Sequence, residues 1–143
     1  MSAKKLFLLL ACSTLLLGSC SWEKEIGPEY YTYPLVGDEL STPEGRVPST
    51  EKVTVQANVR NRYGDFYVQV KYDVVWTDDN GNEQTKQQSS SIRYYDATDA
   101  TIFYTATLPR QNPGCTVYWS IVATNEYGLT TATTPRSYTV YQP

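Results

Sequence analysis

The chain has no histidine, and among its 143 residues it has only three cysteines and one methionine. Histidine is the side chain best suited to proton transfer near neutral pH and is the commonest metal ligand, so its absence excludes His-dependent catalytic triads and His-containing zinc sites. Cys12 and Cys20 lie near the N-terminus and Cys115 stands alone, so the body of the chain cannot form an internal disulfide. We expect a noncatalytic protein without a metal or a cofactor, whose fold depends on its core.

Clustered basic residues are also lacking. The formal net charge is −3, and it falls to −5 if the segment that contains Lys4 and Lys5 is removed. A surface that binds nucleic acid needs clustered lysine and arginine to neutralise phosphates. The composition therefore argues against a nucleic-acid partner.

Long apolar runs are confined to the N-terminus. Lys4 and Lys5 precede an apolar stretch of 12 residues, 6–17. A transmembrane helix needs about 20 apolar residues, whereas a stretch of this shorter length is typical of a secretory signal peptide. Two small residues, at 18 and 19, then precede Cys20. This order predicts a cleaved signal peptide over residues 1–19.

Residues 17–20 (LGSC) resemble the bacterial lipobox. The resemblance implies that Cys20 is acylated and becomes the new N-terminus after cleavage. Residues 22–25 (WEKE) are similar to the acidic export signals of Bacteroidetes surface lipoproteins. We therefore expect attachment to the outer membrane through the lipid on Cys20, with the cell surface favoured over the periplasmic face.

Residues 20–50 are interpreted as the acylated N-terminus followed by a flexible tether. Prolines and glycines recur through this segment, and no helical period is present. Tyr30, Tyr31, Tyr33 and the pair at 35–36 are too apolar for a plain spacer. They either pack on the domain as an irregular first strand, which we favour, or contact a partner.

Residues 51–143 alternate between apolar and polar side chains with the period of a β-strand. The alternation is clearest over residues 53–59, 68–76 and 117–123. Asn80 and Gly81 form a strong hairpin-turn signal after the second of these segments. We expect one all-β sandwich of six to seven short strands.

Four segments resemble the fibronectin type III-like modules of bacterial secreted proteins. They are residues 53–59 (VTVQANV), 104–109 (YTATLP), 114–128 (GCTVYWSIVATNEYG) and 137–140 (SYTV). The resemblance covers residues 52–141 and implies an immunoglobulin-like Greek-key sandwich. Because such folds carry many functions, it implies no catalytic chemistry and no particular ligand.

Three loops of such a sandwich would meet at one end, and here they carry tyrosine and arginine. Tyrosine offers a large contact area with little loss of conformational entropy on binding. The same rings could instead cover the end of the core or simply be exposed. The candidate ligand-binding residues are Tyr63, Tyr94, Tyr95, Tyr127, Arg62 and Arg93.

These patterns together favour a noncatalytic, lipid-anchored lipoprotein whose β-sandwich serves as a protein-binding or assembly module at the outer membrane. The alternative is a carbohydrate-binding surface lipoprotein that uses the loop tyrosines. The partner would accordingly be an envelope protein or a glycan. The sequence alone identifies neither.

Overall fold

The computed structural model describes residues 32–37, 45–96 and 100–143. The predicted signal peptide, the acylation site at Cys20 and most of the predicted tether lie outside the described residues. Within the described part, no helix is long and apolar enough to cross a membrane.

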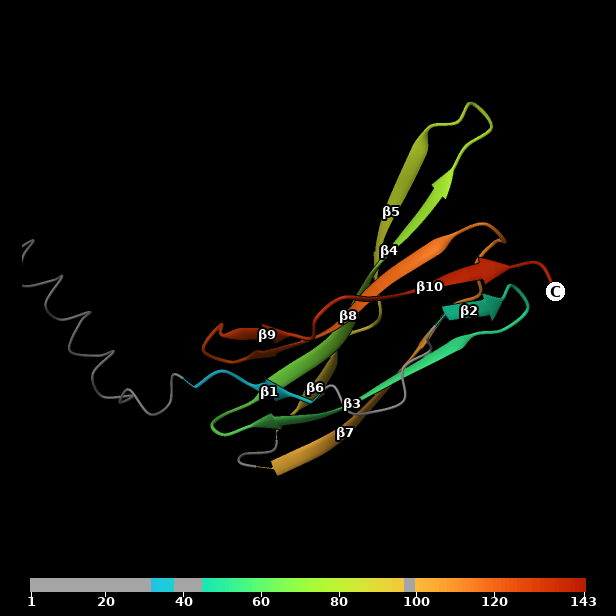
Figure 1. Ribbon diagram of the computed structural model, residues 1–143. Coiled ribbons are helices and arrows are strands. Elements are labelled where there is room, and N and C mark those ends of the chain that lie inside the picture. The colour runs from blue at the N-terminus through green and yellow to red at the C-terminus, as the bar shows by residue number, and fades with distance from the viewer. Residues whose placement is uncertain (1–31, 38–44, 97–99) are drawn as a thin grey trace, which may run out of the picture. The chain divides into compact units, whose positions relative to one another are not determined.

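The described chain is all-β, and its strands form two sheets (Figure 1). The small sheet has the order β1 (Leu35–Val36), β3 (Val53–Asn61), β7 (Ala100–Leu108). The large sheet has the order β2 (Gly45–Pro48), β10 (Arg136–Tyr141), β8 (Thr116–Asn125), β4 (Phe66–Thr77), β5 (Glu83–Ser89). Two short strands complete it: β6 (Arg93–Tyr95) pairs with β4, and β9 (Thr130–Ala132) pairs with β8. Neighbouring strands are antiparallel except for β2 and β10, which are parallel.

One hydrophobic core is shared by the inner faces of both sheets. Alternate residues of β3, from Val53 to Val59, are buried, and the residues between them face outward. The same alternation runs along β4 and through the first half of β8, where Trp119 is 3% exposed. The period-two pattern therefore places the apolar side chains of both sheets in a single sandwich-like core.

The described chain has ten strands, more than the six or seven predicted. Residues 130–141 form two strands, β9 and β10, because pairing stops before Pro135, which has no backbone N–H to donate. The polar strand after the Gly81 turn ends at Ser89. There the hydroxyl of Ser90 accepts a hydrogen bond from the N–H of Val70, and pairing with β4 resumes at β6.

Two further strands come from the segment predicted to be a tether. β1 pairs with β3, with Val36 opposite Val59, and β2 pairs with β10 through Val47, which is buried. The compact unit spans Thr32–Pro143, so the folded domain begins earlier than residue 51. The structure therefore shows the segment paired as a strand, with Val36 packed against the core and Leu35 exposed.

The β4–β5 hairpin turns at the predicted Asn80 and Gly81, where Gly81 has a φ of +82°. A carboxylate oxygen of Asp78 accepts hydrogen bonds from the N–H groups of Asn80 and Asn82. The bond from Asn82, with others from Gln84 and Asn80, lowers the pKa of Asp78. The oxygen-bearing side chains near Asp78 are therefore explained by the hydrogen bonds that form the turn.

Candidate functional site

The three segments that carry the predicted ligand-binding residues meet at one end of the sandwich. The loops at 62–65 and 126–129 are joined by a hydrogen bond from the N–H of Glu126 to the carbonyl of Asp65, at 2.9 Å. β6 lies beside them, because Tyr95 pairs with Phe66, and Phe66 also pairs with Asn125 at the end of β8. We call residues 62–65, 93–95 and 126–129 the tyrosine end.

Two buried asparagines at strand ends hold the loops of the tyrosine end. The side-chain amide of Asn61, the last residue of β3, donates to the carbonyls of Tyr63 and Gly64 at 2.8 and 2.9 Å. The side-chain oxygen of Asn125, the last residue of β8, accepts from the N–H groups of Tyr127 and Leu129, both at 3.1 Å. These bonds satisfy backbone groups that strand pairing no longer reaches.

The four predicted tyrosines share this end but not one surface. Tyr95 turns inward and stacks on Phe66, with ring centroids 5.1 Å apart, so it covers the core. Tyr94 points to the opposite face, is 75% exposed and lies against Tyr67. The difference follows from strand geometry, in which successive side chains point to opposite faces. Tyr63 and Tyr127 are both partly buried.

The two predicted arginines lie over neighbouring rings. The guanidinium carbon of Arg62 is 5.3 Å from the ring centroid of Tyr63, and that of Arg93 is 5.9 Å from the ring centroid of Tyr95. Distances of this size allow cation–π attraction. Both arginine side chains are exposed, and so are the carboxylates of Asp65 and Glu126, so the tyrosine end carries charges of both signs.

The N-terminal segment of the domain adds a surface that includes Tyr33 and Leu35, for which the sequence left packing and partner contact as alternatives. The side-chain amide of Asn125 donates to the carbonyl of Thr32 at 2.9 Å, which fixes the start of the described chain at the tyrosine end. Tyr33 and Leu35 are then 58% and 63% exposed. They line a hollow of about 260 Å³ whose residues are Thr32, Tyr33, Leu35, Arg60 and Arg62. Tyr30 and Tyr31 lie outside the described residues.

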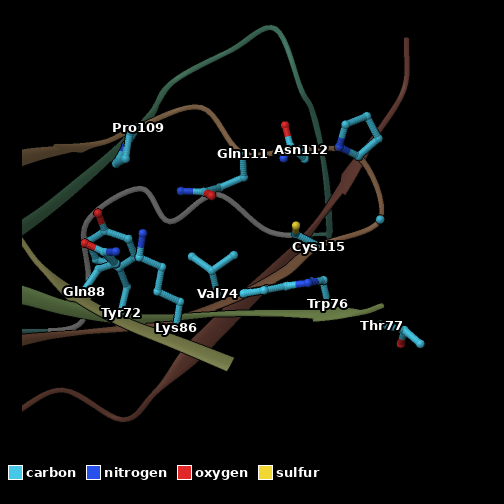
Figure 2. Close-up of a pocket in the computed structure, with 12 residues that line it drawn as sticks. Tyr72, Val74, Trp76, Thr77, Lys86, Gln88, Pro109, Gln111, Asn112 and Cys115 are labelled. Atoms are coloured by element: carbon cyan, nitrogen blue, oxygen red, sulfur yellow. The ribbon is translucent and has the colours of Figure 1, made fainter. Parts of the chain in front are cut away.

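A larger hollow, of about 690 Å³, lies at the opposite end of the sandwich (Figure 2). We call it the Trp76 groove. β4 provides its floor, β5 one wall, and the loop between β7 and β8 the other wall. Its lining residues are Tyr72, Val74, Trp76, Thr77, Lys86, Gln88, Pro109, Gln111, Asn112, Pro113, Gly114 and Cys115.

The walls of this groove are fixed by backbone pairing. Lys86 lies opposite Val74 and Gln88 lies opposite Tyr72 in the β4–β5 register, so both side chains share the face of the groove. The other wall is tied to β10, because the N–H of Gly114 donates to the carbonyl of Val140 and the N–H of Val140 donates to the carbonyl of Cys115. Burial raises the pKa of the Cys115 thiol.

The sequence pattern does not indicate the groove, because the alternation over residues 68–76 gives Trp76 the same phase as the core residues of its strand. Trp76 does have the inward phase of its strand, but it is only partly buried. β8 pairs with β4 no further than Val75, so at Trp76 the only neighbouring strand is β5. The polar side chains of β5, which lie opposite this part of β4, were the signal in the sequence that could have indicated the groove. They leave the inner face of the sheet there without apolar side chains to cover it.

Comparison with known proteins identifies no family. No protein-family model and no curated protein matches the sequence. Among solved structures, the chain is similar to Spo0M, a sporulation control protein from Bacillus subtilis, with 15% identity and a TM-score of 0.46 over 78% of this chain. The match covers 49% of Spo0M, so the chain spans about half the length of that protein.

A second similar structure is a protein of Bordetella pertussis described as ApaA, with 18% identity and a TM-score of 0.33. The match covers 77% of this chain and 89% of the Bordetella protein. Both likenesses are too low in identity and TM-score to indicate a function.

Proposed function

We propose that this chain is a noncatalytic lipoprotein, anchored in the outer membrane through acylated Cys20, whose β-sandwich is a protein-binding or assembly module. The proposed fold is an immunoglobulin-like, fibronectin type III-like Greek-key sandwich. Three features support that fold: the order β1-β3-β7 in one sheet, the order β10-β8-β4-β5 in the other, and the parallel pairing of β2 with the last strand.

The position of Thr32 at the tyrosine end is the observation that carries the functional proposal. Cys20 precedes Thr32 by 12 residues in the sequence. Twelve residues span at most about 40 Å when fully extended. A chain acylated at Cys20 would therefore hold the tyrosine end within that distance of the membrane. A partner that sits in or on the same membrane is the one this end could reach.

The chemistry of the tyrosine end suits a protein contact. Tyr33 and Leu35 beside this end and Tyr94 within it are exposed, and Arg62 both lines the N-terminal hollow and lies over the ring of Tyr63. Tyrosine and arginine are enriched among the residues that contribute most to protein–protein binding. Carbohydrate stacking on the four tyrosines is less favoured, because Tyr94 and Tyr95 point to opposite faces.

Site-specific crosslinking in living cells tests this function. A photoreactive amino acid would replace Tyr94 or Tyr33 in the full chain, and Tyr118, exposed on the outer face of the large sheet, would serve as the control position. We expect Tyr94 and Tyr33 to crosslink to a defined envelope protein, and the Cys20→Ala change to abolish these products. Equal products at Tyr118, or products that do not require Cys20, would contradict the proposal.

A further inference from the structure

We propose that the Trp76 groove binds a pyranose ring of a glycan. This site lies at the end of the sandwich opposite the proposed protein contact, and it shares no residue with the tyrosine end. The proposal adds a ligand class and a location to the proposed function but does not depend on it. Three properties of the groove carry it: an aromatic face, a rim of free amides and fixed walls.

The aromatic face comes from the indole of Trp76. In Figure 2 this ring is seen edge-on along the floor of the groove, and its face is turned toward Asn112 and Cys115 across the hollow. One side of a pyranose ring presents apolar C–H groups, which pack well on a flat aromatic surface. Trp76 is partly buried and packs against the core, so the ring is held in place while part of it lines the groove.

Amides and one ammonium group line the groove beside the indole, with Gln88 next to Tyr72 and Gln111 and Asn112 on the loop wall (Figure 2). Gln88, Gln111 and Asn112 line the groove, and within the described chain none of their side-chain amides has a hydrogen-bond partner. Each amide offers two donors and an acceptor oxygen, and Lys86 adds three donors. Sugar hydroxyls both donate and accept, so a mixed rim of this kind matches the edge of a pyranose ring.

The size and charge of the groove favour a sugar over other small ligands. Its volume of about 690 Å³ lies within the range of about 300–1,000 Å³ that is usual for ligand pockets. Among the described residues, Lys86 is the one cationic side chain that lines it, whereas recognition of phosphates generally uses several cationic groups or a ring of backbone N–H groups. An uncharged, hydroxyl-rich ring therefore fits the groove better than a nucleotide.

The walls of the groove are held before any ligand arrives. β5 is paired with β4 over its whole length, from Glu83 opposite Thr77 to Ser89 opposite Lys71. The facing loop is pinned to β10 at Gly114 and Cys115. A preformed site loses less conformational entropy on binding, so even a single sugar ring would be bound measurably.

Calorimetric titration of the full chain, purified in detergent, tests the proposal. The probes are soluble neutral oligosaccharides of glucose, galactose, mannose and N-acetylglucosamine. We expect at least one of them to bind with a Kd tighter than about 1 mM and to change the tryptophan fluorescence. Trp76→Ala should weaken that binding by more than about tenfold.

Further variants keep the test decisive if Trp76→Ala does not fold. Gln111→Ala and Asn112→Ala alter only the loop wall and should each weaken binding several-fold. Tyr118→Ala is the matched control, an exposed aromatic residue outside the groove, and Tyr94→Ala is the control for the tyrosine end; both should bind the sugar as the wild type does. Binding of extended peptides but not of sugars would overturn the proposal. So would no binding by any probe, or binding lost in Tyr94→Ala but kept in the groove variants.

Discussion

Trp119 and Trp76 have the same strand phase but different surroundings. Trp119 is 3% exposed and lies between β4 and β10, whereas Trp76 lies beyond the last residue of β4 that pairs with β8. Trp119→Ala should therefore lower the free energy of unfolding by about 3–5 kcal/mol, and Trp76→Ala by about 1–2 kcal/mol, because less of its surface is buried. Urea unfolding of the two variants measures the difference. Equal losses would show that Trp76 is a full core residue.

Tyr138 gives the domain a sensitivity to alkaline pH. Burial, with a smaller effect of Tyr72, raises the pKa of Tyr138 from 10.0 to about 12. Below pH 10 both the folded and the unfolded chain keep this proton. Between pH 10 and 12 the unfolded chain releases it first, so the free energy of unfolding falls over that interval. Burial also raises the pKa of Tyr72 and Tyr104, which adds to the fall.

Tyr138→Phe tests this effect. The hydroxyl of Tyr138 is buried without a hydrogen-bond partner in the described chain. Its removal should leave stability at pH 7 unchanged or slightly raised, since an unpaired buried polar group is costly. Thermal unfolding of the variant between pH 9 and 12 should show a smaller decrease in Tm than the wild type. The same decrease in both proteins would place the cause elsewhere.

At the scale of the strand, the sequence predicts elements that are long enough to show a period. β3, β4 and β8 are each nine or more residues long, and each was recognised from its alternating apolar side chains. β1 and β2 have two and four residues, too few for a period, and they pair with distant strands, so local sequence does not indicate them. Prolines nearby instead favoured a tether.

The two candidate surfaces could likewise be predicted only in part from local sequence. Bringing the three tyrosine-bearing segments to one end follows from strand order, but the direction of each ring depends on its position within β6. The Trp76 groove depends on where β8 stops pairing with β4, which is a property of two distant segments. Neither property can be obtained from the local pattern of either strand.

β1 and β2 should contribute measurably to stability. β2 buries Val47 and covers one edge of β10 through four paired positions. A chain of residues 32–143 should therefore be more stable than residues 50–143 by at least about 2 kcal/mol, mainly from the apolar surface that is lost. Chemical unfolding of both chains, followed by circular dichroism, measures this difference. Equal unfolding midpoints and slopes for the two chains would mean that β1 and β2 do not contribute measurably to stability.

At the scale of the whole molecule, the two ends of the sandwich differ in chemistry. The end where the described chain begins has exposed tyrosine, leucine and arginine, and the opposite end has an amide-rimmed groove over an indole. If Cys20 carries the lipid, the chain runs from the anchor into the first end of the domain at Thr32, and the groove lies at the other end of the domain. Membrane attachment and ligand capture would then be assigned to opposite ends of a single small domain.

Metabolic labelling with a clickable fatty acid tests the lipid anchor most directly. Cells would express the full chain or its Cys20→Ala variant, with Cys12→Ala as the matched control inside the leader. We expect the wild type and the Cys12→Ala chain to incorporate the label and to fractionate with the outer membrane. We expect the Cys20→Ala chain to remain an unlabelled, unprocessed precursor. Normal labelling of the Cys20→Ala chain, or a wild-type chain that carries no label, would contradict the account.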